Sequence, residues 1–141
     1  MRNSLKLEFH HINFVSDDVD ALHQFYTEVL GLDDIPIASF PRPKATIKSG
    51  YSGKIRFATD GFMQMHLAEK DLTVAAKNGR DINPVERGHV AFRTDDIKGF
   101  MESLDQKGIV YSDYGTNFAK EWHQIFFLDP EGNIIEVHQS V

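Results

Sequence analysis

The sequence predicts an α+β fold in which two units follow one another, each with the order strand, helix and three strands. The segment that begins at His11 recurs 78 positions later at His89, with the shared pattern His, aliphatic, any, Phe, any, Ser or Thr, Asp, Asp, aliphatic. In both copies an alternating apolar pattern, typical of a strand, is followed by apolar residues at helical spacing. Three runs of strand character then follow each helix, which completes the repeat.

The first unit is expected at about residues 8–69. Ile12 and Phe14 alternate along its first strand, and Ser16 with the two aspartates after it indicates a helix N-cap. The helix is expected to end at Gly31. The later runs of strand character in this unit are residues 35–40, 54–58 and 62–69.

The second unit is expected at about residues 88–140. Val90 and Phe92 alternate along its first strand, Thr94 stands where Ser16 stands in the first unit, and the helix should end before Gly108. The later strand runs are residues 109–113, 123–129 and 133–139, and the linker between the units is about 70–87.

Composition limits the possible functions. With 141 residues and 41% hydrophobic content, the chain 1–141 suits one compact domain. A formal net charge of −6 argues against a nucleic-acid partner or an anionic membrane surface. No segment is apolar enough for a signal peptide or a membrane span, so a cytoplasmic location is expected. There is no cysteine, so any metal must be held by His, Asp or Glu.

Strand alternation places the candidate site residues on one face of the sheet. If Ile12 and Phe14 face the helix, His11 faces away from it, and His10 falls on the helix side or at the strand edge. The ends of the two units also correspond, which sets His66 against Glu136. Four ionisable residues are therefore expected on the face opposite the helices: His11, His66, His89 and Glu136.

A single histidine on a strand is more often solvated or hydrogen-bonded than a metal ligand. Four ionisable residues at repeat-equivalent positions favour a metal site, and imidazoles with a carboxylate suit Zn, Ni, Mn or Fe(II). Among the other polar residues, Asn13 and Arg93 share the proposed inner face, with surface solvation as an equal alternative. His138 is expected at the rim rather than as a partner of Glu136, and His23 is expected to face solvent.

Three segments resemble the vicinal oxygen chelate superfamily, which groups glyoxalases, bleomycin resistance proteins and extradiol dioxygenases. HHINFVSDDVDALHQFYTEVLGL resembles its opening strand and helix, GHVAFRTDDI the start of its second module, and FFLDPEGNIIEVHQ its closing motif. The likeness covers most of residues 9–139. It implies paired βαβββ modules in an open cup-shaped mixed sheet, with the helices on the convex side, and a homodimer with sites completed between modules.

The resemblance also implies roles for individual residues. His11 matches the first-strand metal ligand, His89 the first ligand of the second module, and Glu136 the closing carboxylate. His66 stands where glyoxalase I enzymes usually have a glutamate, so the sequence departs from that pattern at this position.

The function expected from these features is that of a metal-dependent enzyme. It would be a lyase, isomerase, thiol transferase or dioxygenase that holds a small oxygen-rich substrate by two adjacent oxygens on a divalent ion. Glu136 is the predicted proton-transfer residue if the reaction needs a base. One alternative is a metal-free binding protein of the bleomycin-resistance type, for which loss of the ligand residues would be expected. Another is a relative that keeps the fold and binds metal only incidentally.

Overall fold

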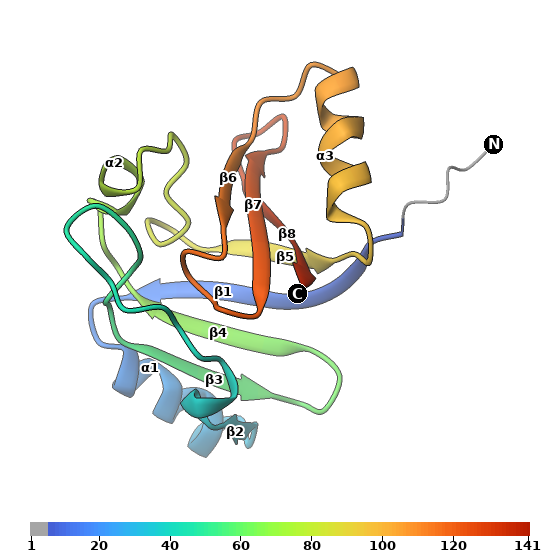
Figure 1. The fold of residues 1–141 in the computed structure, drawn as a ribbon. Helices are drawn as coiled ribbons and strands as arrows, with labels where there is room; N and C mark the ends of the chain where they lie inside the picture. The colour runs from blue at the N-terminus through green and yellow to red at the C-terminus, as the bar shows by residue number, and fades with distance from the viewer. Residues whose placement is uncertain (1–5) are drawn as a thin grey trace.

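The structure, a computed structural model, describes residues 6–141. In this part of the chain eight strands form one mixed sheet in the order β2-β3-β4-β1-β5-β8-β7-β6 (Figure 1). The strands are β1 Glu8–Ser16, β2 Asp33–Ile35, β3 Ile55–Thr59, β4 Gln64–Glu69, β5 His89–Arg93, β6 Ser112–Gly115, β7 Trp122–Leu128 and β8 Ile134–Ser140. The helices are α1 Val19–Gln24, which continues as a π-helical turn Phe25–Val29, α2 Val74–Lys77 and α3 Ile97–Gln106, with a 3₁₀ turn at Ile37–Ser39.

The sheet is symmetric about its centre, where β1 and β5 pair antiparallel. Each of these strands has a parallel neighbour on its other side, β4 beside β1 and β8 beside β5. All the remaining pairs are antiparallel. Figure 1 shows the two halves steeply inclined to each other, with the edge strands β2 and β6 apart. The predicted α+β fold with two repeated units and an open sheet is confirmed.

The helix starts differ from the prediction by two residues. Asp18 and Asp96 are the N-caps of α1 and α3, and their side chains accept hydrogen bonds from the backbone of Ala21 at 3.1 Å and Gly99 at 3.0 Å. Ser16 and Thr94, the predicted caps, instead accept from the backbone N–H groups of these two aspartates. The hydroxyls therefore order the turn before each helix, while the carboxylates cap it.

The outer face of β1 is only partly covered. α1 packs on β3, β4 and β1, whereas α3 packs on β8, so each helix stays largely over its own half. Ile12 and Phe14, which were expected to lie under a helix, are 40% and 41% exposed, and Phe9 is 68% exposed. An apolar strip, defined here as Phe9, Ile12 and Phe14, therefore runs along the centre of the convex face.

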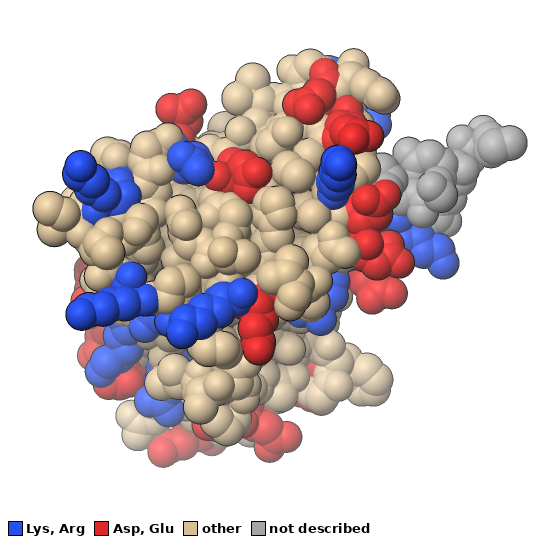
Figure 2. Space-filling view, in the orientation of Figure 1, with Lys and Arg blue, Asp and Glu red and all other residues tan. Residues whose placement is uncertain are grey.

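Among the described residues, part of the buried apolar side chains forms two clusters. One lies under α3 and includes Ile97, Leu104, Ile125 and Val137. The other includes Tyr51, Tyr114 and Phe126 with residues of the linker, and some of its members line the inside of the cup. No described helix is both long and apolar enough to cross a membrane. Figure 2 shows an uncharged area on the face in view, bordered below and on the left by Lys and Arg side chains and on the right mainly by acidic ones.

Candidate metal centre

Strand register brings the predicted site residues into equivalent places in the two halves. In the first half, Asn13, two residues after His11, pairs with His66 on β4. In the second half, Ala91, two residues after His89, pairs with Glu136 on β8. Because both pairs are parallel and alternate residues share a face, the four predicted residues point into the cup.

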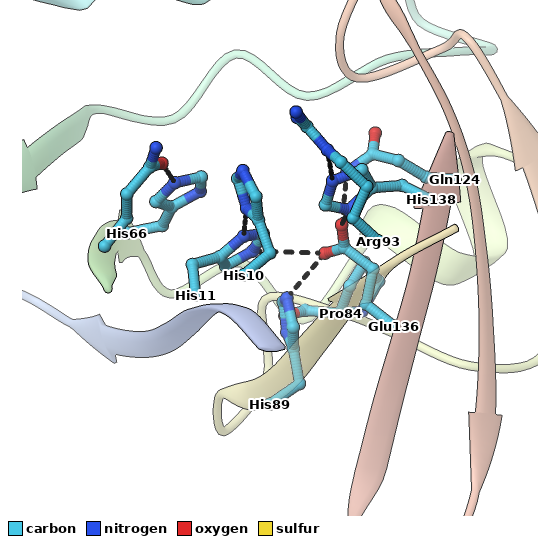
Figure 3. Close-up of polar contacts among 10 residues, drawn as sticks. His10, His11, His66, Pro84, His89, Arg93, Gln124, Glu136 and His138 are labelled. Carbon is cyan, nitrogen blue, oxygen red and sulfur yellow. Dashed lines mark hydrogen bonds and ion pairs between the residues drawn. The ribbon is translucent and has the colours of Figure 1, made fainter. Parts of the chain in front are cut away.

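Three of the four predicted residues converge on one point. His11 Nε2 lies 3.4 Å from Glu136 Oε1, and His89 Nε2 lies 2.9 Å from the same oxygen (Figure 3). One ligand atom from each residue lies within 4.8 Å of the others. All three side chains are at least 95% buried, so the group is held by the sheet and shielded from solvent.

His66 lies beside this group without joining it. Its ring stacks on the ring of His11, with centroids 3.6 Å apart and planes 9° apart. Its Nε2 lies 2.7 Å from the side-chain oxygen of Gln64. The close set described above does not include His66, and its role as a fourth ligand stays a prediction.

The proton positions at His89 favour a cation in this group. His89 Nδ1 lies 3.1 Å from the carbonyl oxygen of Pro84, so Nδ1 bears a proton and donates it. In the neutral ring, Nε2 then presents a lone pair to the Glu136 oxygen 2.9 Å away. Two lone pairs face each other, so a second proton or a metal ion is needed between them.

The distances suit a metal ion. Metal–ligand bonds of about 2.1 Å put neighbouring ligand atoms about 3.0 Å apart in an octahedron and about 3.4 Å apart in a tetrahedron. The two contacts of the Glu136 oxygen, at 2.9 and 3.4 Å, lie close to the range between these two separations. The residues present therefore fit a divalent ion held by His11, His89 and Glu136.

The charges of the group are consistent with this fit. Burial lowers the pKa of His11 despite the nearby carboxylate, and burial next to His11 lowers the pKa of His66 well below its ordinary value. Burial acts to raise the pKa of Glu136, but contacts with His11, His138 and His89 hold it well below its usual range. Neutral imidazoles beside an ionised carboxylate are the protonation states that metal binding requires.

His10 lies on the inner side of the sheet, so the prediction that it faces the helix is wrong. The pairing of β1 with β5 shifts between Phe9 and His11, and this β-bulge turns the His10 side chain inward. His10 Nδ1 lies 2.8 Å from His11 Nδ1. Burial, followed by the neighbouring His11, lowers the pKa of His10 to about 3.

His138 is fully buried, so the prediction of a rim position is also wrong. Its Nδ1 lies 2.8 Å from Glu136 Oε2, and its Nε2 accepts a hydrogen bond from Arg93 Nε at 3.1 Å. His10, His11 and His138 form a second close set of ligand atoms. The Arg93 cation at His138 and the absence of a carboxylate from this set make it the poorer cation site.

The cup contains a cavity of about 100 Å³ beside the candidate metal centre. Side-chain oxygens of Asn13 and Gln124 are buried there without a hydrogen-bond partner among the described residues. The sequence suggested Asn13, whereas Gln124 reaches the cavity from β7, where it pairs with His138 on β8. The rest of the lining is mostly apolar and includes Arg42 and six aromatic side chains: Phe40, Tyr51, Phe57, Phe118, Trp122 and Phe126. An apolar wall with a few free acceptors suits a small ligand that carries hydrogen-bond donors.

Comparisons with known proteins agree with this geometry. The model of the Glyoxalase/Bleomycin resistance protein/Dioxygenase superfamily matches residues 8–137. No curated protein matches the chain in sequence.

Solved structures share the fold. A hypothetical protein from Bacillus halodurans C-125 has a TM-score of 0.67 at 17% identity, with 96% of each chain covered. Methylmalonyl-CoA epimerase from Mycobacterium tuberculosis has 0.65 at 15% identity, covering 100% of this chain and 93% of that one. A Streptomyces coelicolor methylmalonyl-CoA epimerase variant in complex with 2-nitronate-propionyl-CoA has 0.63 at 21%, covering 98% and 96%. From its sequence match, supported by its fold, the chain belongs to the glyoxalase, bleomycin resistance protein and dioxygenase superfamily.

Proposed function

We propose that the protein is a metal-dependent enzyme of the glyoxalase and dioxygenase type that acts on a small oxygen-rich substrate. The observation that supports this most is the convergence of His11 Nε2 and His89 Nε2 on one oxygen of the buried Glu136. The proposed ligands are these three residues, with His66 as a candidate fourth. A divalent ion held there would supply Lewis-acid stabilisation of negative charge on adjacent substrate oxygens.

The chain itself would provide binding and proton transfer. The aromatic wall would hold the apolar part of the substrate and exclude water, and Asn13 and Gln124 would accept hydrogen bonds from it. Glu136 is the only acidic residue among those that line the described cavity. It therefore remains the proposed proton-transfer group for a reaction that needs one.

An isomerase is one form of this proposal, since two of the structures with the same fold are methylmalonyl-CoA epimerases. The same two histidines and one carboxylate also suit Fe(II) in an oxygenase, and a lyase or thiol transferase would use the same ligands. Assays of untagged protein loaded with each metal against substrates of these classes would separate the reaction types.

Metal analysis tests the proposal. Untagged protein is expected to hold about one equivalent of Zn, Ni, Mn or Fe(II). His89→Ala and Glu136→Ala should each weaken binding by about 100-fold or more, because each removes a ligand. His123→Ala is the matched control, since His123 contacts Asp113 outside the cup. If the wild type holds no stoichiometric metal and takes up none of these ions, the metal-free binding protein becomes the better description.

We also propose that the chain forms a homodimer through the apolar strip of Phe9, Ile12 and Phe14. In the described structure, both modules of one chain supply the site, so the dimer is not needed to complete it. The strip lies between two equivalent halves on the convex face, where a second copy can place the same strip against it.

A further inference from the structure

We propose that His138 and Arg93 are positioning residues that hold the Glu136 carboxylate in its metal-binding orientation. The proposal rests on the proposed function and adds two residues outside the ligand set. Figure 3 shows these side chains in line, with Arg93 next to His138 and His138 next to Glu136.

Arg93 determines where the proton of His138 lies. A guanidinium nitrogen can only donate a hydrogen bond, so His138 Nε2, 3.1 Å from Arg93 Nε, must present a lone pair. The ring proton is therefore on Nδ1, which donates to Glu136 Oε2 at 2.8 Å. Donation thus runs in one direction, from Arg93 through His138 to the carboxylate.

This hydrogen bond determines which oxygen of Glu136 is free to bind a metal ion. The terminal torsion of a glutamate is broad, so a carboxylate without partners turns easily. Here Oε2 lies near two donors, His138 Nδ1 at 2.8 Å and Gln124 Nε2 at 3.4 Å. Oε1 is left to face His11 and His89. The orientation is therefore set before any ion binds.

Packing prevents the His138 ring from turning away. The ring has no solvent exposure and stacks on Trp122, with centroids 4.2 Å apart and planes 2° apart. The Arg93 guanidinium lies over the same indole, 5.3 Å from its centroid. Trp122 therefore supports both members of the pair.

The internal repeat shows that this pair is not required by the fold. Arg93 and His138 are register partners on β5 and β8. The equivalent partners in the first half are Val15 and Ala68 on β1 and β4, where the position of Glu136 is occupied by His66. The arginine–histidine pair thus occurs only in the half that carries the carboxylate.

Metal affinity, measured by competition with a chromogenic chelator, tests the proposal. His138→Leu removes the donor and should weaken Zn²⁺ or Ni²⁺ binding by about 10 to 100-fold. His138→Asn should stay within about threefold of the wild type, because its amide nitrogen stands as many bonds from Cβ as Nδ1 of histidine. Arg93→Met should weaken binding by roughly 10-fold. Arg56→Met is the control, since Arg56 pairs with Asp20 and Asp34 outside the cup.

A second measurement does not depend on metal. Long-range proton–nitrogen NMR spectra of the metal-free protein should show His138 with its proton on Nδ1. A proton on Nε2, or His138→Leu and Arg93→Met variants that fold and bind metal like the wild type, would overturn the proposal and leave the proposed function intact. A wild type that binds no metal would overturn both.

Discussion

His10 and His11 are neighbours in the sequence. Strand alternation predicts that their side chains lie on opposite faces of the sheet, but in the structure both point inward. Alternation and the repeat predicted that His11, His89 and Glu136 share a face, and the structure brings these three together. The same rule failed for His10, because a β-bulge interrupts the alternation and nothing in the apolar pattern marks it. His138 was misplaced because its burial depends on Trp122 in another strand, which a pattern along one strand does not include.

The buried neutral histidines predict an acid-sensitive fold in the metal-free protein. In the unfolded chain a histidine has a pKa near 6.5, whereas burial lowers the pKa of His11 and His66 in the folded state. Below about pH 6.5 the unfolded state therefore binds protons that the folded state does not, and stability falls with pH. Each such histidine can cost up to about 2 kcal/mol by pH 5.

Urea unfolding at pH 7.5 and pH 5, with a chelator present, checks this expectation. His66→Gln should lose less stability than the wild type between the two pH values, because one buried imidazole is gone. His123→Gln is the control for loss of a histidine that contacts Asp113 outside the cup. Equal pH dependence in wild type and His66→Gln would contradict the prediction.

At the scale of elements, the central strands were easier to predict than the edge strands. β4 and β8 match their predicted ranges within two residues. The predicted strand at residues 35–40 contains only the last residue of β2, followed by Pro36 and a 3₁₀ turn, in which the Pro36 carbonyl accepts a hydrogen bond from Ser39. Proline cannot donate to a ladder, so it ends the edge strand early.

The position of His23 on α1 differs from the prediction. It was expected to face solvent, yet it is 6% exposed, and its Nε2 lies 2.8 Å from Asp34 Oδ1 and 3.2 Å from the carbonyl oxygen of Phe57. The helix therefore packs on β2 and β3 partly through a polar contact. Apolar spacing alone could not identify this residue as part of the buried face.

Gly88 allows β5 to start close to β1. Its φ is +86°, and a Cβ added there would meet the backbone oxygen of Asn13 on β1. Gly88→Ala should therefore lower the free energy of unfolding by about 3 kcal/mol, from strain and displacement of β5 together. Because His89 follows directly, metal affinity should fall as well.

The Gly79→Ala variant separates the cost of backbone strain from the cost of a steric contact. Gly79 has a similar φ of +66°, but an added Cβ would have no neighbour within 4 Å. This variant should cost only about 1 kcal/mol and keep its metal affinity. Chemical denaturation of both variants checks the difference, and similar losses would show that the contact with Asn13 is unimportant.

For the whole molecule, the internal repeat predicted the fold, but the cover of the convex face could not be predicted. The apolar alternation of Ile12 and Phe14 correctly indicated a strand. It could not show that each helix would lie mainly over its own half and leave the centre partly exposed, because helix placement depends on contacts distant in sequence.

The proposed role of this exposed centre as a dimer interface can be tested. Sedimentation at micromolar concentration should show a dimer, and Phe9→Glu should weaken it by about 10-fold or more, since it places a charge in an apolar contact. Phe62→Glu is the control, because Phe62 is 92% exposed and lies in the turn before β4. A monomeric wild type would count against the dimer.

Because His66 and Glu136 occupy equivalent positions in the two halves, the two sides of the cup differ chemically. Two identical half-chains related by a two-fold axis could form such a cup, but they would present the same two groups from both sides. In this chain one side offers an imidazole and the other an ionised carboxylate. A flat ligand in the cup would meet different chemistry on its two faces. The difference between His66 and Glu136 at equivalent positions therefore makes the two sides of a nearly symmetric sheet chemically distinct for a bound ligand.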